Sequence, residues 1–205
     1  MNEASGFLCA RVEAMAVREI LHVGNPLLRE RSREISRDEL GSASIQQLID
    51  DLIDTMHDAN GAGIAAPQVG ELVRIATIEV TKNPRYPYKP PIPLTVVVNP
   101  VIEPLDDELV EINEGCLSVP NMRGNVMRFV NVRVKFWDRD GSEHDEVWRG
   151  LKSGTFQHEC DHLDGLLFLD KVHDTTSLTT WDQFERFHRA AFVERITAFV
   201  ERVGS

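Results

Sequence analysis

Three residues between positions 158 and 162 have the types and spacing of a metal-dependent hydrolytic site. His158 and His162 are four residues apart, so on a helix both imidazoles lie on one face and reach one metal ion. Glu159 lies on an adjacent face, where its carboxylate is placed to act on a water held by that ion. This H-E-x-x-H pattern favours hydrolytic chemistry over its alternative, a chance match on an exposed polar helix.

Cys160 stands inside the same pattern but is not expected to bind the metal. Two residues along a helix correspond to a rotation of roughly 200°. The thiol therefore faces away from both histidines, and its predicted role is packing.

Two imidazoles leave a tetrahedral ion short of a protein ligand. In one class of zinc proteases the pattern continues to a third histidine, but Phe168 stands at that position here, although Gly165 fits. In another class a downstream glutamate binds the ion. Glu185 and Glu194 are present, but both belong to the last amphipathic segment, and His173 is more typical of a surface residue after a helix.

The remaining candidates for the third ligand are cysteines. Cys116 follows Gly115, which lets the backbone approach an ion closely, and Pro120 ends any strand soon after. The spacing alone does not choose Cys116 over Cys9.

The segments that position these residues are predicted to include both helices and strands. Apolar residues at helical spacing predict a helix over about 44–59, and a second helix over about 151–164 carries the histidines and ends at Gly165. A last amphipathic helix is predicted over about 178–203. Strands are predicted over 73–80, 94–98, 129–137 and 143–148, the last two as a hairpin. Short strands between separated helices indicate an α+β fold in one domain, 1–205, with residues 1–14 as a possible dispensable extension before Met15.

Bulk properties exclude several classes of protein. The net charge of −11 argues against broad binding of nucleic acid, whose phosphates an acidic protein repels. Three cysteines in 205 residues do not make a disulfide scaffold and fit a reducing, cytoplasmic compartment. The longest aliphatic run, over 94–98, is strand-sized, so no membrane span is expected.

Three segments in order resemble the peptide deformylase family. They are GAGIAAPQ over 61–68, EGCLS over 114–118 and QHECDH over 157–162. The resemblance extends from Val17 to the last helix, and the continuation through Pro120 resembles the bacterial form. It implies antiparallel sheets packed around a central helix that carries the metal motif, closed by the C-terminal amphipathic helix.

The family resemblance also implies roles for particular residues. Cys116, His158 and His162 would bind the metal, with a water in the fourth position, and Glu159 would be the general base and then the acid. Gln68 and the backbone N–H of Leu117 would face the oxyanion formed on the formyl carbon. The residues implied to bind substrate are Ala62, Gly63, Gly115, Arg123, Gly154 and Thr155.

The implied reaction is the removal of the N-formyl group from N-formylmethionyl nascent peptides, with release of formate. The implied cofactor is one divalent metal ion per chain, with Fe2+ as the native ion and Zn2+ or Ni2+ as ions of the purified protein. Gly154 and Thr155 are smaller than the residues of many relatives. The pocket for the methionine side chain is therefore expected to be wider than usual or filled from elsewhere.

Two other functions and one partner are compatible with parts of the sequence. A metalloprotease cutting internal peptide bonds fits H-E-x-x-H but lacks the usual third ligands. A catalytically degenerate metal-binding relative would not need Glu159. Arginines in the last helix could touch the ribosome, but interleaved glutamates make a solvated face the simpler interpretation. These arginines are Arg186, Arg189, Arg195 and Arg202.

Overall fold

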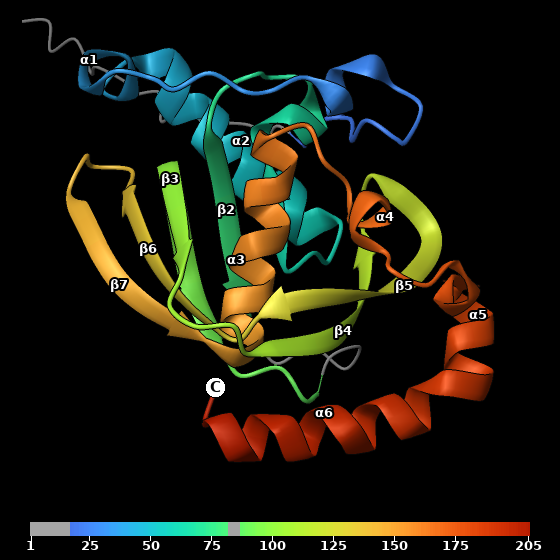
Figure 1. The fold of residues 1–205 in the computed structure, drawn as a ribbon. Helices are drawn as coiled ribbons and strands as arrows, with labels where there is room; N and C mark the ends of the chain where they lie inside the picture. Colours follow the sequence, from blue (N-terminus) through green and yellow to red (C-terminus); the bar gives the residue numbers. More distant parts are fainter. Residues whose placement is uncertain (1–16, 82–86) are drawn as a thin grey trace, which may run out of the picture.

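A computed structural model describes residues 17–81 and 87–205, so the expected extension over 1–14 lies outside the described residues. The α+β prediction is confirmed, because two antiparallel sheets lie on either side of one central helix (Figure 1). No helix in the described ranges is long and apolar enough to cross a membrane.

The larger sheet has five strands in the order β1-β2-β3-β6-β7. Their bounds are Gly63–Ala65 for β1, Ile75–Val80 for β2, Ile92–Pro104 for β3, Asn131–Trp137 for β6 and Glu143–Arg149 for β7. The predicted hairpin over 129–148 is present as β6 and β7. β3 extends well beyond the five residues that its aliphatic run indicated.

The smaller sheet has the order β4-β5-β8 and was not predicted as a sheet. Its strands are Leu109–Cys116 for β4, Val119–Phe129 for β5 and Thr179–Thr180 for β8. β4 and β5 form a hairpin whose tight turn lies directly after Cys116. This turn is what places the cysteine at the end of a strand.

The two predicted internal helices are both present. α2 runs over Ala43–Asp58 and α3 over Gly150–Leu163, within one residue of their predicted bounds. Short helical segments are η1 Pro26–Arg29, α1 Arg37–Leu40, η2 Ala66–Val69, α4 Phe168–Lys171 and η3 Thr175–Ser177. Gly165 is left-handed (φ 73°), as expected for a residue that ends α3.

The last predicted helix is wrong only over its first three residues, 178–180. Thr179–Thr180 is extended and pairs with β5, and it is followed by α5 over Trp181–Gln183 and a π-helical turn over Phe184–His188. From Trp181 onward the chain is helical as expected, and its longest regular part is α6, over Arg189–Val203. It runs below the smaller sheet in Figure 1 and buries Phe192, Ile196 and Phe199.

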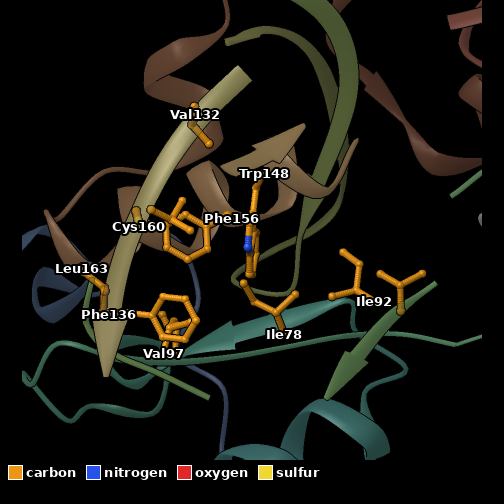
Figure 2. Packing of buried hydrophobic residues seen from close by; sticks show 13 residues of the cluster. Ile78, Ile92, Val97, Val132, Phe136, Trp148, Phe156, Cys160 and Leu163 are labelled. Carbon is orange, nitrogen blue, oxygen red and sulfur yellow. The ribbon is translucent and has the colours of Figure 1, made fainter. Parts of the chain in front are cut away.

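The central helix α3 is held by the core of the larger sheet. Figure 2 shows Phe156, Cys160 and Leu163 of α3 beside Trp148 and Phe136 of the sheet. The Trp148 and Phe156 rings meet edge to face at 4.7 Å. Cys160 therefore packs in the core, as its helical phase predicted, and burial raises the pKa of its thiol. The opposite face of α3 is left for the polar residues of the motif.

Candidate active site

The turn after β4 and the middle of α3 bring three metal-binding side chains together. Cys116 is the last residue of β4, and His158 and His162 are one turn apart on α3. One donor atom from each residue lies within 4.8 Å of the others. Cys116 Sγ is 3.2 Å from His162 Nε2, and the two imidazole rings are 5.0 Å apart.

This cluster fits a divalent transition metal ion. One sulfur and two imidazole nitrogens form a donor set that zinc, iron and nickel accept. Burial lowers the pKa of His162, which keeps its imidazole in the neutral form that binds metals. Three protein ligands also leave a coordination position for a reactant.

His158 is oriented by a buried carboxylate. Glu114 Oε2 lies 2.9 Å from His158 Nδ1, so the imidazole presents its other nitrogen to the cluster. Arg128 donates two hydrogen bonds to the Glu114 carboxylate and one to Asp161. Burial alone would raise the pKa of Glu114, but the Arg128 charge and hydrogen bonds hold it well below its usual range. Glu114 is therefore an ionised acceptor for the histidine.

Glu159 is buried and incompletely paired. The residue is 4 % exposed, and Oε2 has no hydrogen-bond partner among the described residues. Burial raises its pKa to about 7. The carboxylate lies against Gly63 of β1, where an added Cβ would stand only 2.3 Å from Glu159 Oε1. Glycine at 63 is what allows the carboxylate to occupy this place.

Gln68 points its amide nitrogen at the sulfur ligand. Its Oε1 accepts a hydrogen bond from Ala65 N–H at 2.8 Å, which fixes the amide orientation. Its Nε2 then donates to Ser118 Oγ at 3.0 Å and lies 3.6 Å from Cys116 Sγ. Gln68 and Leu117, which lies between the cysteine and the serine, both line a cavity beside the metal cluster.

Arg123 is buried, although arginine is a residue type that usually lies on the surface. It is 3 % exposed and donates to the Asn113 side chain at 2.6 Å and to its backbone oxygen at 2.7 Å. Its guanidinium stacks on Trp181 at 4.4 Å and on Phe184 at 4.9 Å. A Cβ at Gly115 would stand 3.2 Å from the Arg123 side chain, so the glycine makes room for it.

Most of these groups border one cavity of about 460 Å³, although His162, Ser118 and Arg128 are not part of its lining. The expected substrate-binding residues Ala62, Gly63, Gly115, Arg123, Gly154 and Thr155 all line it. So do Cys116, His158 and Glu159, and the cavity therefore joins the metal cluster to room for a ligand.

The sequence patterns did not indicate several residues that line or support the site. The sequence patterns assign no role to Glu114, but it lies two residues before Cys116 and so on the same side of β4. That alternation could have identified it. No local signal marks Arg128, Tyr88 or Lys89, because only the fold brings them to the site.

Comparison with known proteins gives the same family throughout. The sequence profile described as Polypeptide deformylase matches residues 17–177. A peptide deformylase of Leptospira biflexa is 43 % identical over 162 residues, covering 78 % of this chain and 90 % of its own. Peptide deformylase 1 of Prochlorococcus marinus is 40 % identical over 191 residues, covering 93 % and 97 %.

Solved structures agree with the fold. The Met-Ala-Ser-bound class I type b peptide deformylase of Acinetobacter baumannii superposes with a TM-score of 0.75 at 38 % identity, covering 77 % of this chain and 99 % of that one. A Synechococcus elongatus peptide deformylase in complex with actinonin gives a TM-score of 0.70 at 30 % identity, covering 86 % and 90 %.

Proposed function

This chain belongs to the polypeptide deformylase family. We propose how its residues remove the N-formyl group from N-formylmethionyl peptides. Cys116, His158 and His162 hold one divalent metal ion. The supporting observation is the grouping of their three donor atoms within 4.8 Å beside the buried Glu159 carboxylate.

The reaction breaks the C–N bond of a formamide and adds water to the formyl carbon. The metal ion supplies Lewis-acid polarisation of the formyl oxygen and of water when it is bound. Glu159 takes a proton from the attacking water and delivers it to the departing amine. Formate and a free N-terminal amine are the products.

Two donors face the oxygen that becomes negatively charged. The Gln68 amide, held by Ala65 N–H, and the backbone N–H of Leu117 stabilise the oxyanion without having to reorganise. One such donor is typically worth roughly 3 kcal/mol of transition-state stabilisation. Ala62, Gly63 and Gly115 then align the peptide backbone as an added strand.

The ion that we propose for the native enzyme is Fe2+, and Zn2+ or Ni2+ for protein purified in air. The mixed sulfur and nitrogen donor set suits all three ions. Anaerobic purification followed by elemental analysis tests this, and iron below the zinc content in anaerobic protein would contradict it.

The cellular compartment of the reaction and its partners are also proposals. A cytoplasmic enzyme fits the low cysteine content. Transient ribosome contact would use Arg186, since Arg189, Arg195 and Arg202 all pair with glutamates of this chain. Co-sedimentation with ribosomes that is equal for the parent and Arg186→Glu would refute that contact.

Formate release from formyl-Met-Ala-Ser, by protein loaded anaerobically with Fe2+, tests the reaction. We expect formate from this peptide and no cleavage of unformylated Met-Ala-Ser. Cleavage within unformylated peptides would instead indicate the metalloprotease. Metal-replete protein that hydrolyses no formylated peptide would indicate the degenerate relative.

A further inference from the structure

Tyr88 and Lys89, just before β3, line the cavity of the metal cluster although nothing in the sequence marked them. Tyr88 packs edge to face on Phe192 of α6, with ring centroids 5.3 Å apart. It joins the apolar cluster that includes Ile112. The C-terminal helix therefore fixes where the residue after Tyr88 lies.

Lys89 places a cationic hydrogen-bond donor at one wall of the cavity. Its Nζ donates to Thr155 Oγ1 at 3.2 Å, and Thr155 is one helical turn from Glu159 on α3. Burial lowers the pKa of Lys89 to about 8, and its amine remains mostly protonated at neutral pH.

The space that glycine leaves at position 154 is filled by a side chain from another element. A Cβ at Gly154 would stand 2.5 Å from Ile112 Cδ1, so the isoleucine of β4 occupies this space. Ile112 and Leu151 make an apolar wall, and the Lys89–Thr155 pair makes a polar wall of the same cavity. A side chain that enters here meets hydrocarbon along its length and an ammonium group beside it.

We propose, resting on the proposed function, that Lys89 is a specificity-determining residue that makes the enzyme deformylate peptides beginning with methionine sulfoxide as well as methionine. The sulfoxide keeps the length of methionine and adds a neutral oxygen that accepts a hydrogen bond from Lys89, whereas a thioether sulfur is a weak acceptor. Substrate side chains that carry a carboxylate are disfavoured, because Glu114 and Glu159 already border the cavity and would repel a further negative charge.

The test compares three formyl peptides of matched length, which begin with norleucine, methionine or methionine sulfoxide and continue with Ala-Ser. kcat/KM is measured for the parent, for Lys89→Met and for Lys135→Met, a matched control on the exposed face of β6. Norleucine carries no acceptor, so the sulfoxide-to-norleucine ratio isolates the hydrogen bond. We expect Lys89→Met to lower that ratio roughly ten-fold or more, and Lys135→Met to leave it unchanged.

A ratio that stays within about two-fold in Lys89→Met would overturn the inference. No formate from formyl-Met-Ala-Ser with the parent would instead overturn the proposed function. If Lys89→Met turned over none of the peptides, affinities for the three deformylated products, measured by calorimetry, would give the same ratio. Equal relative affinities in the parent and variant would again refute the role of Lys89.

Discussion

At the scale of single residues, the position of the general base Glu159 depends on Gly63, which takes no part in the chemistry. Gly63 leaves the space that the Glu159 carboxylate fills. Gly63→Ala should lower kcat/KM roughly 100-fold, because a displacement of about 1 Å in a catalytic group has that effect. Gly41→Ala, whose added Cβ would meet its nearest neighbour at 3.7 Å, is the control and should keep parent activity. Full activity in Gly63→Ala would show that Glu159 does not need this position.

Glu114 acts on the metal through His158. Glu114→Gln keeps the size of the side chain but removes the charge that orients the imidazole and pairs with Arg128. We expect metal affinity to fall roughly 10- to 100-fold. Competition with a chromogenic chelator measures this, with Glu103→Gln on the exposed part of β3 as the control. An affinity equal to that of the control would contradict the orienting role.

At the scale of elements, the smaller sheet was the part of the fold that sequence patterns did not reveal. β4 and β5 turn Glu114, Arg123 and Arg128 inward, so the apolar–polar alternation that identifies a strand is broken. The same inward polar residues build the site. By contrast, β6 alternates regularly through Val132, Val134 and Phe136, and its prediction is confirmed.

The prediction of a helix at residues 178–180 was wrong for a related reason. Thr179 and Thr180 are β-branched and pair with Met122 and Arg123 of β5, and this tertiary pairing overrides the helical spacing of the apolar residues after them. The two histidines were predictable because they are close in sequence, whereas Cys116 followed only from the family resemblance. Lys89 was not predictable, because its place is set by Tyr88 packing on α6.

The β6–β7 hairpin gives the fold a measurable pH dependence. His144 lies 3.0 Å from Asp138 and 3.3 Å from Glu146, and the hydrogen bond to Asp138 is the main cause that raises its pKa above 6.5. A raised folded-state pKa stabilises the protein below the unfolded value, and this contribution is lost as the pH rises through the folded value.

His144→Gln removes that contribution. The unfolding free energy of the parent, relative to the variant, should fall by at most about 1 kcal/mol between about pH 5.5 and about pH 9, since the side chain is partly exposed. Urea unfolding at several pH values measures the difference. A difference that is constant or grows with pH would contradict the assignment.

At the scale of the whole molecule, we propose that residues 1–205 form one domain whose two sheets share α3. Each sheet packs on the helix that carries His158 and His162, so metal binding and folding are coupled. Metal at 100 times its dissociation constant stabilises the fold by about 2.7 kcal/mol. Chelation should therefore lower a single thermal transition by roughly 5–10 °C. Two separable transitions in calorimetry would contradict one domain.

The proposed reaction depends most on Glu159, the base beside a metal held by other residues. The direct measurement is formate release from formyl-Met-Ala-Ser by Fe2+-loaded Glu159→Gln, together with its metal content, with Glu103→Gln as a matched exposed control. We predict a loss of kcat of roughly 100- to 10,000-fold with parent metal content. Release at the parent rate by a variant that retains its metal would contradict the assignment of Glu159.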